Sequence, residues 1–192
     1  MRIHRFPLLC LALAAGHALA ASPVVDAARL DASGQGFQGN LTINQAAGDA
    51  VQQANARAVA IGHNTSARTE VQQRNDWQAN PARDASAAIT GNAFNHGSGM
   101  LGINQSAGAA TQQANSVRIG ISAIAQSIDD SILSQQAVAL ANGSETTDHV
   151  PGSRQVTTSD QAFTGSRGVV QLNQSAGVGN RMANTLSVRV AD

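Results

Sequence analysis

The sequence predicts an all-β fold of three stacked strand–turn–strand repeats, arranged either as a β-solenoid-like array or as a stack of hairpins. One motif recurs three times along the chain. Within each copy, apolar and polar residues alternate with the period of two that is typical of a half-buried strand. Glycine interrupts this alternation at the same place in every copy, which indicates a turn. Polar, partly disordered segments are expected to connect the copies.

The first element is a secretory signal peptide over residues 1–20. Arg2 and Arg5 precede an apolar run, and Ala18-Leu19-Ala20 provides the small residues of a cleavage site. The run is shorter than the roughly 20 residues that a transmembrane helix needs. We therefore expect a periplasmic or extracellular protein with no membrane insertion after signal removal. Because Cys10 lies inside the signal, the mature chain would contain no disulfide.

Residues 21–192 are expected to form a single repeat domain. The full chain has one Trp, no Tyr and four Phe, so the core must consist of Val, Ile, Leu and many Ala. Such a composition suits a stacked or assembled structure better than an isolated globule. The formal net charge is zero and lysine is absent, which argues against a nucleic-acid partner.

The three copies lie near 33–62, 93–122 and 162–190. Each copy contains a stretch that begins with a glycine, which is followed by alternating apolar and polar residues that include Asn-Gln. A tetrapeptide begins at the same spacing in every copy, four residues after the glycine that ends this stretch. That tetrapeptide is Gln-Gln-Ala-Asn at 52–55 and 112–115, but Arg-Met-Ala-Asn at 181–184. The three copies align with one another without insertions or deletions at these positions, which indicates one structural unit repeated three times.

Two strands and a turn are predicted in each copy. The first strand carries the alternating pairs Leu41/Ile43, Leu101/Ile103 and Val170/Leu172. The predicted turns are Ala47-Gly48-Asp49, Ala107-Gly108-Ala109 and Ala176-Gly177-Val178. The second strand ends in alternating β-branched residues, although the Ala- and Gln-rich stretch 50–60 could also form a helix.

The connecting segments contain further elements. Residues 69–73 and 131–136 resemble each other and are predicted to be counterpart strands. Residues 80–84 and 143–152, each with a proline, are predicted to be mobile loops.

Amide side chains at matched positions are the candidate assembly residues. If the copies stack in register, equivalent amides lie about 4.8 Å apart and can form hydrogen-bonded ladders. The alternative is that they are solvated surface residues of hairpins. The expected columns and the further matched glutamines are Asn44, Asn104 and Asn173; Asn55, Asn115 and Asn184; Gln45, Gln105 and Gln174; and Gln53 with Gln113.

The stretch from Gly99 to Gly108, followed by Gln112-Gln113-Ala114-Asn115, resembles the repeats of the Fap functional-amyloid system of Pseudomonas-like bacteria. This system contains fibre subunits and a small periplasmic chaperone-like accessory. Its fibre subunits tend to end in a cysteine pair, which this chain lacks. Arg181-Met182 also departs from the repeat, and charge in a stacked amide column would discourage fibre growth. It could equally mark a capping copy of a finite stack. The resemblance and these departures favour the accessory.

The leading hypothesis is therefore an exported binding protein that pairs its repeats with amyloid subunits of the same system by β-augmentation. The alternative is a fibre nucleator or minor structural subunit that self-associates. An enzyme is not expected, because both G-x-G-x-x-G matches (34–39 and 97–102) lead into strands and no catalytic constellation is present. The three histidines that would survive signal removal, His63, His96 and His149, lack metal-ligand spacing, and no cofactor or metal is expected.

Overall fold

The computed structural model describes residues 24–63, 65–77, 82–122, 133–137 and 152–191, all of them in strands, turns or irregular connections. The predicted signal peptide lies outside these residues. Their strands are β1 (Val24–Asp31), β2 (Gln38–Ala47), β3 (Gln52–Gly62), β4 (Val71–Asn75), β5 (Arg83–Thr90), β6 (Ser98–Ala109), β7 (Gln112–Ser122), β8 (Leu133–Ala137), β9 (Arg154–Thr158), β10 (Arg167–Val178) and β11 (Arg181–Ala191).

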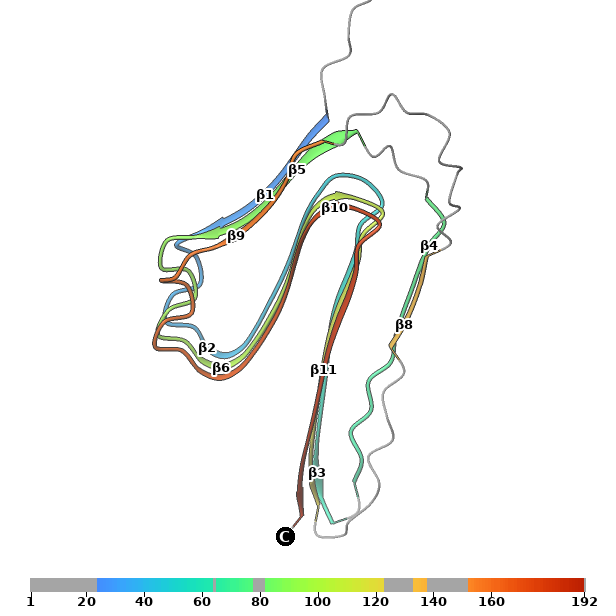
Figure 1. Cartoon of the computed structure of the whole chain (residues 1–192). Helices are drawn as coiled ribbons and strands as arrows, with labels where there is room; N and C mark the ends of the chain where they lie inside the picture. The colour runs from blue at the N-terminus through green and yellow to red at the C-terminus, as the bar shows by residue number, and fades with distance from the viewer. Residues whose placement is uncertain (1–23, 64, 78–81, 123–132, 138–151, 192) are drawn as a thin grey trace, which may run out of the picture.

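Equivalent strands of the three copies form each sheet. The sheet orders are β1-β5-β9, β2-β6-β10, β3-β7-β11 and β4-β8, and every pairing is parallel. Figure 1 shows each copy winding through the layers with the copies lying almost on top of one another. Consecutive strands of one copy belong to different sheets. The prediction of a β-solenoid-like array is therefore confirmed, and the alternative, a stack of hydrogen-bonded hairpins, does not form.

The apolar core lies between the β1-β5-β9 and β2-β6-β10 sheets. Leu101 and Ile103 of β6 are almost fully buried there against Ile89 and Phe94. Phe94 stacks on Phe163 with a ring-centroid distance of 5.5 Å and an interplanar angle of 16°. Equivalent residues of successive copies therefore extend one continuous core along the stack.

Where the same two sheets continue beyond this core, small side chains replace large ones. Ala28, Ala85, Ala87 and Ala107 form a second buried cluster. Burial of alanine rather than leucine lets the two sheets approach each other closely, so this part of the interface depends on side-chain size.

Several element boundaries differ from the sequence prediction. β6 continues through Gly108 to Ala109 and β10 through Gly177 to Val178, so these turns begin three residues later than predicted. The glycines remain paired in the parallel ladder, because their positive φ bends the strand without ending it.

The predicted loop at 80–84 is wrong at its end, because Arg83 and Asp84 begin β5. The rest of that loop lies largely outside the described residues, as does 143–151. The counterpart strands are confirmed as β4 and β8, with Val71 paired to Leu133. The helical alternative for 50–60 is wrong, since β3 covers Gln52–Gly62.

The middle copy is covered on both sides, whereas the first and third copies each leave one row of strand edges open. Most of β6 and β7 is buried. β2 and β11 alternate mainly between exposed and partly buried positions, β3 is mostly partly buried, and β10 alternates between buried and partly buried positions from Gln171 onward. No helix that could cross a membrane occurs in the part of the chain that the structure describes.

Candidate assembly interface

The predicted asparagine columns lie between the β2-β6-β10 and β3-β7-β11 sheets. In the first column the Nδ2 of Asn104 donates to Asn44 Oδ1 at 2.9 Å, and the Nδ2 of Asn173 donates to Asn104 Oδ1 at 3.0 Å. In the second column Asn115 donates to Asn55 at 3.0 Å and Asn184 donates to Asn115 at 3.1 Å. Both columns are thus continuous ladders of side-chain amides.

Bonds within each copy connect the two columns. Asn55 donates to Asn44 at 2.7 Å, and the same contact recurs in the second and third copies at 3.1 and 2.9 Å. The amides also donate to backbone carbonyls, such as Asn115 to Ile103. Asn104, Asn115 and Asn173 are at most 2% exposed, so the solvated-surface alternative is wrong for them. Their complete pairing explains why polar groups can be buried here.

The glutamine column lies on the opposite face of the β2-β6-β10 sheet. Gln105 donates to Gln45 Oε1 and Gln174 donates to Gln105 Oε1, both at 2.8 Å. Each glutamine also reaches the backbone of the β1-β5-β9 sheet, as Gln45 does at the carbonyl of Arg29. This column therefore links neighbouring copies and neighbouring sheets at once.

The third copy interrupts the next ladder. Gln53 donates to Gln113 Oε1 at 2.9 Å, but the position after Gln113 is Met182, whose Sδ lies 3.8 Å from the Gln113 amide nitrogen. Gln113 instead donates to Ser175 Oγ at 3.0 Å. Arg181 pairs with Gln112 and continues the adjacent column, in which Gln112 donates to Gln52 at 3.0 Å.

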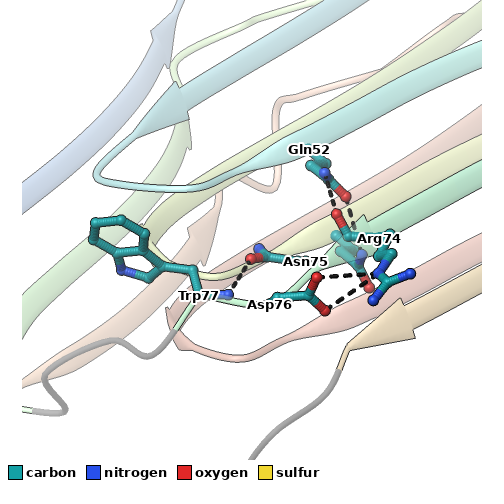
Figure 2. Close-up of polar contacts among 6 residues, drawn as sticks. Gln52, Arg74, Asn75, Asp76 and Trp77 are labelled. Carbon is teal, nitrogen blue, oxygen red and sulfur yellow. Dashed lines mark hydrogen bonds and ion pairs between the residues drawn. The ribbon is translucent and has the colours of Figure 1, made fainter.

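Gln52 also connects this sheet to β4. Figure 2 shows its amide directed at the backbone carbonyl of Arg74, a contact of 2.5 Å. Beside it the Arg74 side chain binds Asp76 at 3.0 Å, and Asn75 Oδ1 accepts the backbone N–H of Trp77. The Gln52 contact joins β4 to the start of β3, and Asn75 also donates to the carbonyl of Ala50 in the turn between β2 and β3.

Two glycine columns flank the amides along the β2-β6-β10 sheet: Gly39, Gly99 and Gly168, and Gly48, Gly108 and Gly177. All six have φ between +85° and +129°. A Cβ on Gly108 would lie 1.9 Å from the carbonyl oxygen of Gly177, so only glycine permits this approach. Sequence reasoning assigned Gly48, Gly108 and Gly177 to turns and missed both columns, although the recurrence of these glycines in register was visible.

A partly buried charge cluster was also missed. Arg83 Nη1 donates to Asp26 at 2.7 Å and its Nη2 donates to Asp49 at 3.0 Å. Burial alone would lower the pKa of Arg83, but the two carboxylates raise it above its ordinary value. Nothing in the sequence places Arg83 beside these carboxylates, because the three residues lie far apart along the chain.

A second arginine lies between the two amide-bearing sheets. Arg57 donates to the carbonyl of Leu41 at 3.0 Å, and burial lowers its pKa. Gly102 makes room for it, since a Cβ there would lie 2.7 Å from the guanidinium. In the same column the later copies have Val117 and Leu186.

The structure therefore brings the predicted amides into columns, and their role in assembly stays a prediction. In the described ranges no group of three or more His, Cys, Asp or Glu could hold a metal ion. A family model described as "Functional amyloid protein FapB/FapC family" matches residues 13–191 of the chain. No solved structure matches it.

Proposed function

We propose that this chain, which belongs to the functional amyloid protein FapB/FapC family, is a structural component of the fibre. Each chain would add three rungs to a parallel stack, where a rung is one copy together with the strand that precedes it. The first copy of one chain would lie on the third copy of another chain. Membership makes the chain a component of a functional amyloid system. Its place there as a subunit or nucleator, rather than as the chaperone-like accessory that the sequence favoured, is our proposal.

One observation carries this proposal: both ends of the stack present the strands that already pair inside the molecule. Asn44 and Gln45 lie on the open side of β2, and Asn173 and Gln174 lie on the open side of β10. The register that joins these residues through β6 can be repeated between chains without changing any backbone conformation. An open edge of parallel strands with matched amides is a template for further pairing.

The test is self-assembly of the mature chain alone, 21–192, at tens of micromolar with an amyloid-sensitive dye and fibre diffraction. We expect seedable fibres with a strand spacing of about 4.8 Å. A chain that remains soluble and delays fibre formation by another subunit of its system would instead support the accessory.

The amide columns provide a second test. Replacement of Asn44, Asn104 and Asn173 by alanine should strongly reduce seeded growth, because every rung loses its ladder bond. The matched control replaces the exposed Gln35, Gln38 and Gln155, which lie outside the columns. Equal growth of the two triple variants would contradict a role for the columns.

A further inference from the structure

We propose that chains stack with a single polarity because Arg154, the first residue of β9 on the open side of the third rung, completes a charge cluster with Asp26 and Asp49 of the next chain. This inference rests on the proposed function and adds the contact that sets direction and register. The occupant of each open end is thus a second copy of this chain, in head-to-tail arrangement.

The junction between the first and second copies shows the charges involved. One guanidinium, that of Arg83, is shared by the carboxylates of Asp26 and Asp49. Asp26 and Arg83 are almost fully buried, while the side chain of Asp49 is 61% exposed. Two carboxylates and one guanidinium leave a negative excess at the open face of the first copy.

Arg154 lies in the same column as Asp26. The register pairs Asp26 with Ala85 and Ala85 with Arg154, so the three residues occupy one position in successive rungs. Arg154 is exposed, and its side chain has no ion pair or hydrogen bond among the described residues. The open face of the third copy therefore carries an unneutralised positive charge at the position where the first copy is negative.

Both side chains lie against the same glycine column. The Cδ of Arg154 is 2.9 Å from the position that a Cβ on Gly177 would take. The Cγ of Asp26 is 3.1 Å from the corresponding position on Gly48. Because Gly48 and Gly177 belong to one column, stacking of the next chain's Gly48 on Gly177 brings both side chains into the same niche.

Continuing the stack by one strand spacing, about 4.8 Å, sets Arg154 beside Asp26 of the neighbour. The cluster then contains two guanidiniums and two carboxylates, and the contact is shielded from water by the rungs on either side. Such a partly buried pair contributes more than an exposed one. Two first copies face to face would oppose carboxylates, and two third copies would oppose guanidiniums, so the charges disfavour both wrong polarities.

The experiment compares seeded elongation of wild type, Arg154→Glu and Arg189→Glu on wild-type seeds. Arg189 is an exposed arginine on the same end of the molecule, and its column continues to Gly120 and Ala60, with no carboxylate. Both variants change the net charge equally. We expect Arg154→Glu to elongate at least about tenfold more slowly than Arg189→Glu, and the difference to shrink at high salt.

A charge swap tests the same contact even if Arg154→Glu is impaired for another reason. Adding Asp49→Arg to Arg154→Glu, and growing this double variant on seeds of the same double variant, places an arginine opposite the new glutamate at every junction and should restore most of the elongation rate. Equal rates for Arg154→Glu and Arg189→Glu, or no recovery in the double variant, would overturn the charge contact while leaving the proposed function in place. Absence of fibres from the wild-type chain would overturn both.

Discussion

Asn104 shows at the scale of one residue how a polar interior can be stable. Its amide donates to Asn44 and to the carbonyl of Ala54, and its oxygen accepts bonds from Asn115 and Asn173. The side chain is fully buried, so each of these partners relies on it. The sequence could predict the column from recurrence alone, but not the bonds between columns, since these depend on how the two sheets face each other.

Asn104→Ala should therefore lower the free energy of unfolding by about 2–4 kcal/mol, because it leaves several buried groups unpaired. Asn44→Ala is the matched control at the open end of the same column, where water can replace the lost bond, and should cost less. Urea denaturation of the soluble chain measures both. Equal costs would mean that burial within the stack does not determine the strength of the ladder.

The glycine columns allow a comparable test of backbone geometry. Gly36→Ala should cost only about 1 kcal/mol, because Gly36 has a φ of 62° but no atom lies within 4 Å of its would-be Cβ. Gly108→Ala combines a φ of 115° with the contact to the carbonyl of Gly177 and should cost clearly more. Thermal or urea unfolding distinguishes them, and similar values would argue against close approach as the reason for glycine.

At the scale of elements, the paired strands β2/β6/β10 and β3/β7/β11 could be predicted from the sequence because their large apolar residues alternate and their amides recur. The β1-β5-β9 sheet could not. Its inward positions include Asp26, Ala28, Ala85 and Ala87, whose types do not indicate a buried strand, and only Leu30 and Ile89 add large apolar side chains that are buried or partly buried. Arg83 fell within the loop predicted at 80–84, and its neutralising partners Asp26 and Asp49 are visible only in three dimensions.

Ala87→Leu tests whether this sheet depends on small side chains. Ala87 is fully buried in the alanine cluster, so added volume should cost about 1–3 kcal/mol. The neighbouring Ala88 has its side chain on the other, partly exposed face, and Ala88→Leu should be nearly neutral. Comparison of the two midpoints in urea provides the measurement, and a tolerated Ala87→Leu would indicate a looser packing of the sheets.

The ends of β1 and β5 are joined by a bond that affects titration. Thr90 Oγ1 donates to Asp31 at 2.6 Å, and this bond, with help from Arg29, lowers the pKa of Asp31 below 3.8. Because folding lowers the pKa of Asp31, the contact stabilises the fold fully at pH values above the ordinary pKa of an aspartate. This stabilisation is lost as the pH falls through the pKa of Asp31 in the folded chain. Thr90→Val should raise the pKa of Asp31 in an NMR titration, and an unchanged value would assign the shift to Arg29 instead.

For the whole molecule, burial is distributed by rung. β6 and β7 are covered by equivalent strands on both sides, whereas the first and third copies are covered on one side only. We expect the amide hydrogens of β6 and β7 to exchange most slowly in the soluble chain. In fibres, β2 and β10 should become equally protected. Persistent fast exchange of β2 and β10 in fibres would contradict end-to-end stacking.

The covered middle rung also has a kinetic consequence. A separate strand in a growing cross-β fibre gains neighbours on both sides only when three molecules meet, which costs the translational freedom of two of them. Here the connecting segments of one polypeptide bring the three rungs together. The entropic cost is then that of closing these connecting loops, and it grows only slowly with loop length. The smallest ordered seed is then close to a single molecule, and the lag before fibre growth should depend only weakly on protein concentration.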